Sequence, residues 1–143
     1  MTHQDSQHHP AWTPLFLAWL IAAFSTLSSL FFSEVMDLVP CELCWYQRIF
    51  MFPLAIILLL ALFPLDTRIV KYALPISGVG ALFAAYHLLL FYGVIPEAMR
   101  PCGKGISCAD ASMELFGFLP IPLLALAAFS GIILLLIKTR NQT

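Results

Sequence analysis

Two pairs of cysteines are the residues of this sequence best able to do chemistry. Cys41 and Cys44 form a C-x2-C pair in the P-C-E-L-C-W-Y-Q-R stretch that ends at Arg48, and Cys102 and Cys108 form a C-x5-C pair further along the chain. Such a set fits three chemistries: four thiolates holding a zinc ion, two structural disulfides, or a relay in which one pair passes electrons to the other by thiol exchange. The spacing alone does not choose among them.

The position of the first pair favours redox chemistry. Proline is favoured in the first turn of a helix, so Pro40 predicts a helix that starts near Cys41. Cys41 and Cys44 then lie one turn apart on one face, compatible with the roughly 4.4 to 6.8 Å between Cα atoms that a disulfide needs. A bridge around Glu42 and Leu43 alone gains little loop-closure entropy, so it would stabilise the fold poorly. A helix N-terminus also favours the reactive thiolate.

Composition places these cysteines in a membrane protein. The 143 residues are 61% hydrophobic and only 10% charged, with a mean hydropathy of +0.91. Soluble domains carry about 25% charged residues, and a soluble fold of this size could not hide so much apolar surface. The formal net charge of -1 offers no basic surface, so nucleic-acid binding is set aside.

Four apolar runs supply the elements that must position the cysteines. They cover residues 15–32, 49–65, 72–92 and 116–137, and each has a length within the roughly 17 to 25 residues that a membrane-crossing helix needs. With one turn added before the second run, the predicted helices are 15–32, 44–65, 72–92 and 116–137. We predict an all-α fold: an integral membrane four-helix bundle, in one domain over residues 1–143, whose short extracytoplasmic loops carry the two cysteine pairs.

A cleaved signal peptide is the alternative interpretation of the first run. Residues 1–13 contain no Lys or Arg, however, and the run is longer than the apolar core of a signal peptide. A transmembrane helix is the better prediction.

The direction of the helices puts all four cysteines on one side of the membrane. Successive helices joined by short loops alternate in direction, so the link after the first helix and the loop after the third face the same side. The opposite side is richer in positive charge, which predicts that it is cytoplasmic and that the cysteines lie outside, where disulfides persist. The residues on that opposite side are Arg68, Lys71, Lys138 and Arg140, against Arg100 and Lys104 when Arg48 is counted within the second helix.

Arg48 and His87 are further candidates because each is an ionisable residue at membrane depth. Arg48 follows Cys44 by four residues, on the same helix face, and His87 lies at a similar depth in the third helix. Snorkelling to the interface is the alternative for Arg48, and a hydrogen bond to a neighbouring helix is the alternative for His87. Beside a thiol pair, the two predict a pocket for an apolar acceptor that becomes anionic on reduction, such as a membrane quinone.

The stretch from Pro40 to Arg48, the later pair Cys102 and Cys108, and the four helices together resemble the DsbB family of disulfide bond formation proteins, especially its shorter BdbC-like branch. The resemblance covers residues 15–137. It implies a protein-disulfide:quinone oxidoreductase of the bacterial cell membrane that reoxidises a DsbA-like extracytoplasmic thioredoxin-fold partner and reduces a quinone, either menaquinone or ubiquinone.

The resemblance also implies individual roles. Cys44 would face the quinone and Cys41 would exchange with the loop pair, in which Cys102 faces the partner and Cys108 exchanges with Cys41. Arg48 and His87 would belong to the quinone site. Only five residues separate the loop cysteines here, fewer than in the better-known DsbB pattern.

Three other functions remain as alternatives. A vitamin K epoxide reductase-like enzyme also joins a C-x2-C pair to a quinone, but its helical thiol pair usually lies near the end of the chain. A thiolate metal-binding membrane protein would use the four cysteines as ligands, although no metal site is predicted because no methionine or histidine cluster accompanies them in the loops. A purely structural membrane protein leaves Arg48 unexplained.

Overall fold

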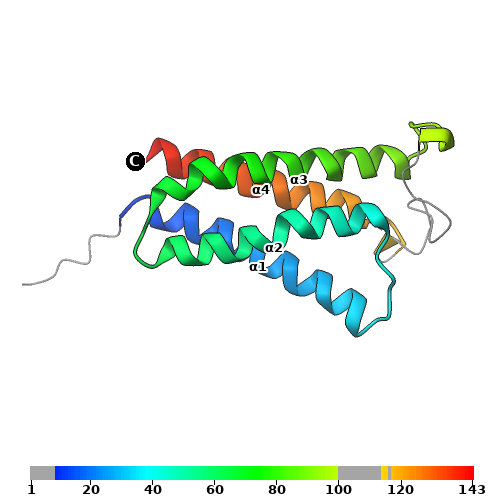
Figure 1. The fold of residues 1–143 in the computed structure, drawn as a ribbon, viewed down its shortest axis with the longest axis horizontal. Helices are drawn as coiled ribbons and strands as arrows, with labels where there is room; N and C mark the ends of the chain where they lie inside the picture. The colour runs from blue at the N-terminus through cyan, green and yellow to red at the C-terminus, as the bar shows by residue number, and fades with distance from the viewer. Residues whose placement is uncertain (1–8, 100–113, 116) are drawn as a thin grey trace, which may run out of the picture.

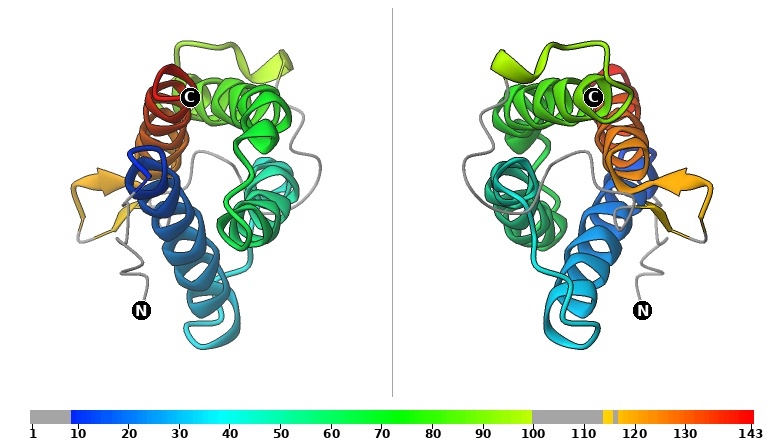
Figure 2. Two further views of the ribbon diagram at one scale, coloured as in Figure 1. Left: turned by 90° about the vertical axis from the view of Figure 1, so that its left-hand side faces the viewer. Right: turned by 90° about the vertical axis from the view of Figure 1, so that its right-hand side faces the viewer.

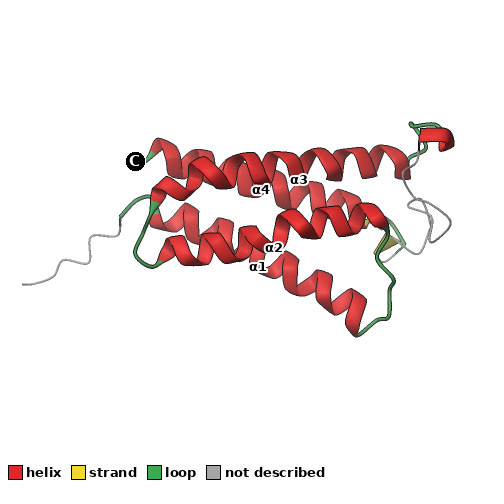
Figure 3. Cartoon of the chain, viewed as in Figure 1, coloured by secondary structure: helices red, strands yellow, loops and turns green. Residues whose placement is uncertain are grey.

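Long α-helices make up nearly all of the structure, a computed structural model that describes residues 9–99, 114–115 and 117–143 (Figure 3). Four helices are long and apolar enough to cross a membrane: α1 (Trp12–Glu34), α2 (Glu42–Leu62), α3 (Val70–Phe91) and α4 (Ile121–Asn141). The described residues also contain two 3₁₀ helices, η1 (Thr67–Ile69) and η2 (Glu97–Met99), and an antiparallel hairpin of β1 (Glu114–Leu115) and β2 (Leu119–Pro120). The predicted all-α membrane fold is confirmed.

Prolines and capping residues set the helix ends that matter for the site. Cys41 is the N-cap of α2, with an extended backbone at φ −71° and ψ 169°, so the helix starts where Pro40 predicted. α4 begins at Ile121 and not near residue 116, because the hairpin and Pro120 precede it. Pro122 lies in its first turn, where the missing N–H would have no partner in any case.

The four helices form a closed ring in which chain neighbours pack together and α1 also packs against α4 (Figure 2). The end of α1, the start of α2, the end of α3 and the start of α4 therefore lie at one end of the bundle (Figure 1). We call it the cysteine end, because Cys41 and Cys44 lie there. α1 and α2 separate toward this end, and the link over residues 35–41 closes the resulting fork (Figure 1).

The core combines buried alanines of α1 and α3 with larger buried side chains of all four helices. Ala18, Ala22, Ala73 and Ala84 are fully buried and allow close approach, while branched and aromatic side chains of the other helices fill the space between them. Many large apolar side chains point outward instead, as expected for helices whose surroundings are lipid tails; the most exposed helical ones are Phe24, Leu27, Leu60, Leu82 and Leu134.

Candidate functional site

The thiols of Cys41 and Cys44 meet at the first turn of α2. Their sulfurs are 3.1 Å apart, and both cysteines are free thiols. The backbone N–H of Cys44 donates to the Cys41 Sγ at 3.4 Å, as the side chain of an N-cap residue ordinarily accepts from a nearby helical N–H. Cys41 is buried and Cys44 is partly exposed. The pair is thus placed to form a disulfide with little movement of the helix.

His87 of α3 lies against Cys41. Its Nε2 atom is 3.7 Å from the Cys41 Sγ, and its side chain is fully buried. On the other side of the ring, the Nε2 atom of Gln47 lies 3.0 Å from His87 Nδ1. The first two turns of α2 and the last turns of α3 are therefore joined by polar contacts that include a reactive sulfur.

These contacts lower the pKa of the Cys41 thiol well below its ordinary value of 9.0. The largest cause is the hydrogen bond from the neighbouring Cys44 thiol, and the contact with His87 and the backbone N–H of Cys44 act in the same direction. Burial opposes them, because it disfavours a charged sulfur. Cys41 is accordingly the thiolate of the pair, which is the form that attacks or leaves in thiol exchange.

Arg48 lies on another side of α2 and contacts α1. Its Nε donates to the Ser29 hydroxyl and its Nη2 donates to the Ser29 carbonyl, both at 2.7 Å. Its guanidinium carbon lies 5.3 Å from the centre of the Trp45 ring, within cation–π range. The charge is held between two helices and an aromatic ring, which fixes its position at the base of the fork.

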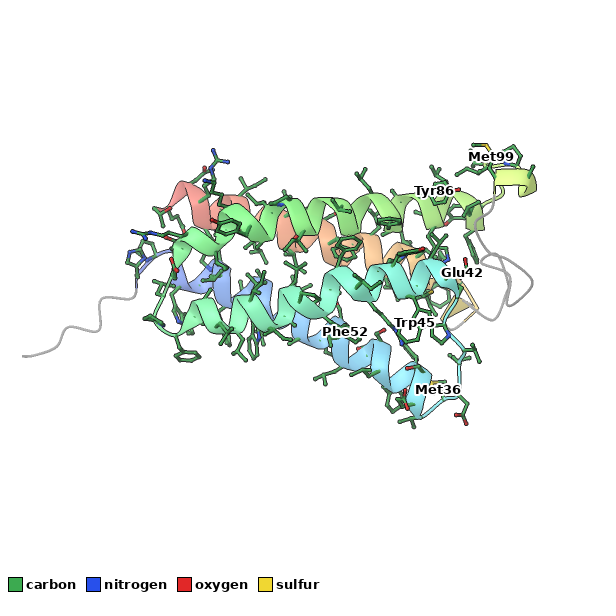
Figure 4. The ribbon with its side chains drawn as sticks, in the orientation of Figure 1. Met36, Glu42, Trp45, Phe52, Tyr86 and Met99 are labelled. Carbon is green, nitrogen blue, oxygen red and sulfur yellow. The ribbon has the colours of Figure 1, made fainter. Side chains whose placement is uncertain are left out.

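A pocket of about 310 Å³ occupies the fork between α1 and α2. Trp45 lies on the side of α2 that faces α1, and it forms part of the pocket wall together with Arg48 (Figure 4). The end of α1 and the link after it supply the other residues, which are polar, acidic or apolar: Ser33, Glu34, Asp37, Leu38, Val39 and Pro40. The volume is at the lower end of the range for small-molecule sites.

Cys44 lies between these two environments. At about 100° per helical residue, Gln47 is about 60° to one side of Cys44 and Arg48 about 40° to the other. The Gln47 side faces α3 and the Arg48 side faces α1. Cys44 itself packs with Cys41 and is not one of the residues that line the pocket.

The predicted site residues divide into two groups in the structure. Cys41, Cys44 and His87 come together on the α3 side of α2, while Arg48 contacts α1 and lines the pocket. The sequence predicted similar depths for Arg48 and His87, but it did not predict that they contact different helices. Cys102 and Cys108 lie outside the described residues.

Sequence reasoning did not single out Gln47 and Ser29. Gln47 carried a readable signal, because it follows the buried Leu43 by four residues and precedes the buried Met51 by four, in an otherwise apolar stripe. A polar residue at such a position needs a hydrogen-bond partner. Ser29 carried no comparable signal, since hydroxyl residues are common where membrane helices pack.

The same cluster could be suspected of holding a metal, because one atom each of Cys41, Cys44 and His87 lies within 4.8 Å of the others. Two thiolates on one tetrahedral zinc ion at about 2.3 Å are about 3.8 Å apart. The observed 3.1 Å between the sulfurs is shorter and fits a hydrogen-bonded thiol pair instead.

Comparison with known proteins assigns the chain to a family. The family described as "Disulfide bond formation protein DsbB" matches residues 11–139. The chain is 50% identical over 133 residues to a "Probable disulfide formation protein" of Metapseudomonas resinovorans, which covers 92% of each chain. It is 43% identical over 128 residues to "Disulfide bond formation protein C" of Bacillus subtilis, which covers 90% of this chain and 93% of that one.

No solved structure gives a significant match. The family match and the two relatives extend over nearly the whole chain, and they include the helix start that carries Cys41 and Cys44. Four membrane-crossing helices and a thiol pair at the end of one of them agree with that assignment. The chain is a multi-pass membrane protein that belongs to the DsbB family of disulfide bond formation proteins.

Proposed function

We propose that the chain is a thiol:quinone oxidoreductase that reoxidises an extracytoplasmic DsbA-like thioredoxin-fold protein and passes the electrons to a membrane quinone, either menaquinone or ubiquinone. One observation carries the proposal. A thiol pair at the start of a membrane helix, with a buried histidine at one sulfur, lies one turn from an arginine that lines a pocket. Disulfide chemistry and an acceptor dissolved in the membrane can meet at that turn.

Electrons enter this chain as thiol exchange. The dithiol of the partner attacks the disulfide of Cys102 and Cys108, which becomes reduced as the partner becomes oxidised. A thiolate of that loop pair then attacks Cys41 in the Cys41–Cys44 disulfide, and Cys44 leaves as a thiolate. Attack by the second loop cysteine on the mixed disulfide releases Cys41. The loop disulfide is restored, and Cys41 and Cys44 hold the two electrons.

A quinone held by Arg48 and Trp45 would supply the oxidising chemistry: it would take up two electrons as the Cys41–Cys44 disulfide forms again, with one proton from the Cys44 thiol and one from water. The N–H of His87 favours the Cys41 thiolate, and Cys44 lies next to Cys41 in the helix turn whose following residue, Trp45, lines the pocket. Arg48 offers a positive donor where the oxygen of the acceptor gains charge on reduction. The residues of this chain thus stabilise the anionic groups on both sides of the electron transfer.

The pocket residues fit a quinone head group. Trp45, Leu38, Val39 and Pro40 provide flat and apolar walls, and Arg48 provides hydrogen-bond donors for a carbonyl oxygen. The exposed carboxylates of Glu34 and Asp37 lie at the link, where water reaches them.

The orientation belongs to the same proposal: the cysteine end faces the extracytoplasmic side. Lys138 and Arg140 lie in the last turn of α4, and Arg68 and Lys71 lie around the start of α3. All four belong to the opposite end of the bundle. The positive-inside rule places that end in the cytoplasm.

The purified protein, reconstituted in lipid nanodiscs, tests the proposal. A reduced DsbA-like thioredoxin-fold protein serves as the electron donor, and short-chain ubiquinone and short-chain menaquinone are tried as acceptors. We expect quinone reduction by the wild type and a loss of at least 1000-fold, on the order of what removal of a covalent nucleophile causes, in Cys41→Ser and in Cys44→Ser. Ser77→Ala serves as the control, because the Ser77 hydroxyl bonds only the Ala73 carbonyl of its own helix in the described part of the chain.

Turnover that survives both cysteine substitutions would refute the mechanism. A thiol count before and after reductant, with the metal content measured on the same sample, distinguishes the remaining class of function. Thiols that appear only after reduction support a disulfide relay. Thiols present throughout, together with stoichiometric zinc, would support metal binding and overturn the proposal.

A further inference from the structure

Gln47 is a buried polar residue in the core-facing stripe of α2. Its side chain is 8% exposed, and the residues one turn before and after it on this stripe are the buried Leu43 and Met51. An amide in an apolar interior is unfavourable unless its hydrogen-bonding groups have partners. The partner here is the ring of His87, at 3.0 Å from the amide nitrogen of Gln47 to Nδ1.

This contact determines which ring nitrogen of His87 carries the proton. A neutral imidazole has one N–H donor and one acceptor nitrogen, and a hydrogen bond at one nitrogen selects the tautomer. Because the NH2 group of Gln47 donates to Nδ1, the proton of the neutral ring is on Nε2. Nε2 is the atom that lies 3.7 Å from the Cys41 Sγ. The ring therefore presents an N–H to the sulfur.

We propose that Gln47 is a positioning residue, which holds His87 as the neutral Nε2–H tautomer directed at the sulfur of Cys41. Gln47 itself does not contact the reacting sulfurs in the structure. It acts through the ring, whose N–H favours the thiolate over the thiol at Cys41. The inference rests on the proposed exchange chemistry, in which Cys41 leaves a mixed disulfide as a thiolate and later forms the bond to Cys44.

The surroundings of Cys41 leave few other groups to set its charge. In the described part of the chain, the buried cluster around it contains Leu43 and Cys44 of α2 and several residues of α3 and its neighbours. The ionisable ones are Cys44, His87 and Tyr86, and the Tyr86 hydroxyl donates to the Met99 carbonyl at 2.8 Å (Figure 4). The remaining cluster residues are apolar: Phe83, Leu90, Phe91, Ile95 and Ile121.

A simpler role for Gln47 is to hold α2 and α3 together, since polar residues often hydrogen-bond across membrane helices. The two roles predict different results. A residue that only joins the helices should affect stability and leave the pH profile of Cys41 unchanged. A positioning residue should move that profile, and it should do so only while His87 is present.

The test uses the reduced protein and measures the rate of Cys41 alkylation as a function of pH, with peptide mapping by mass spectrometry to assign the modified cysteine. We expect Gln47→Leu to move the midpoint of the profile upward by about one pH unit, the size of effect that one hydrogen bond to a thiolate produces. In a His87→Phe background, Gln47→Leu should cause no further shift. Ser77→Ala, which removes a buried hydroxyl of α3 away from the thiols, should leave the profile unchanged.

An unchanged profile in folded Gln47→Leu overturns the proposal, and so does an equal shift in the His87→Phe background. If Gln47→Leu fails to fold, the wild type still decides the matter by nitrogen NMR with ¹⁵N-labelled histidine. The Nε2–H tautomer is expected for the neutral ring of His87 in the reduced protein, and the Nδ1–H tautomer contradicts the proposal. Neither measurement requires quinone or partner, so a failure here leaves the proposed oxidoreductase function standing.

Discussion

The two sides of the first turns of α2 differ in how tightly they are built. On the α3 side, Cys41 is 3% exposed and His87 is fully buried, and both ring nitrogens of His87 lie within 3.7 Å of a polar partner. On the α1 side, Trp45 is 55% exposed and Arg48 borders an open pocket. Thiol exchange needs sulfurs held in fixed positions, whereas a ligand that comes and goes needs access. The proposed thiol exchange and the proposed quinone binding would thus use different faces of one helix start.

The pH dependence of the Cys41 alkylation rate provides the most sensitive test of the α3 side of α2, where the thiol pair is buried. Because its pKa is lowered, Cys41 should already be a thiolate at pH 6, and its alkylation rate should change little from pH 6 to pH 8. A thiol with the ordinary pKa of 9.0 loses roughly 90-fold in thiolate over that interval. Mass mapping of the alkylated, reduced protein measures this.

A tenfold fall in the Cys41 alkylation rate per pH unit below pH 8 would contradict the lowered pKa of Cys41.

The same lowered pKa has a consequence for the stability of the folded protein. Below pH 9.0, Cys41 carries a proton in the unfolded protein but not in the folded protein. The folded reduced form therefore gains stability as the pH rises. This contribution to the free energy of unfolding is complete above pH 9.0, and it is lost as the pH falls through the lowered pKa of Cys41.

Arg48→Met should affect quinone binding on the α1 side of α2 and leave the thiols on the α3 side unchanged. It removes a charged hydrogen-bond donor from the pocket. Loss of such a bond weakens the free energy of quinone binding by about 1.5 to 3 kcal/mol, so the KM for a short-chain quinone should rise roughly 10- to 150-fold. Steady-state kinetics in nanodiscs measure this effect. The alkylation rate of Cys41 should stay within about twofold of the wild type, because the contacts of Arg48 are with α1 and Trp45.

Arg48→Lys is the matched variant for this substitution. A lysine keeps the charge without the forked donor geometry, so it should recover part of the loss. If Arg48→Met changed the pH profile of Cys41 alkylation as strongly as the quinone KM, the α1 and α3 sides of α2 would not act independently.

Gly80→Ala should disturb the closely packed α3–α4 contact. A methyl group at Gly80 would overlap the ring of Phe129, which is fully buried and has no room to move away. Overpacking of this kind costs about 1 to 3 kcal/mol. Reversible unfolding in mild detergent should show that loss, whereas Gly78→Ala, with no atom within 4 Å of the added Cβ, should not be destabilised. Equal stability of the two variants would refute close packing at this point.

Ser29→Ala should have the smallest effect. It removes the hydroxyl that accepts from Arg48 Nε but leaves the Ser29 carbonyl in place. Loss of one such bond corresponds to about 0.5 to 1.5 kcal/mol, so the quinone KM should change by roughly 2- to 12-fold. Ser28→Ala, one residue away, is the control. A Ser28 effect as large as that of Ser29 would indicate a general loosening of α1.

The helices and the redox pair could be predicted from the sequence because they depend on local patterns. Apolar length predicted four spans, and Pro40 predicted that Cys41 lies at a helix start. The division of Arg48 and His87 between two sides could not be predicted. Residue spacing gives depth along a helix, but which neighbour a side chain meets depends on how the helices pack around one another. The separation of α1 from α2 is such a packing result, and no local pattern in residues 12–34 indicated it.

The hydrogen bonds from Arg48 to Ser29 connect the movement of a helix to the charge of the pocket. They join α2 to α1 beside the pocket that Arg48 lines. If α1 swings away from α2, the pocket widens and two guanidinium N–H groups lose their partners in the same motion. Access for a ligand and release of the donors that would hold it are then one event. The hydrogen bonds that hold α1 to α2 thus engage the same guanidinium group that lines the pocket.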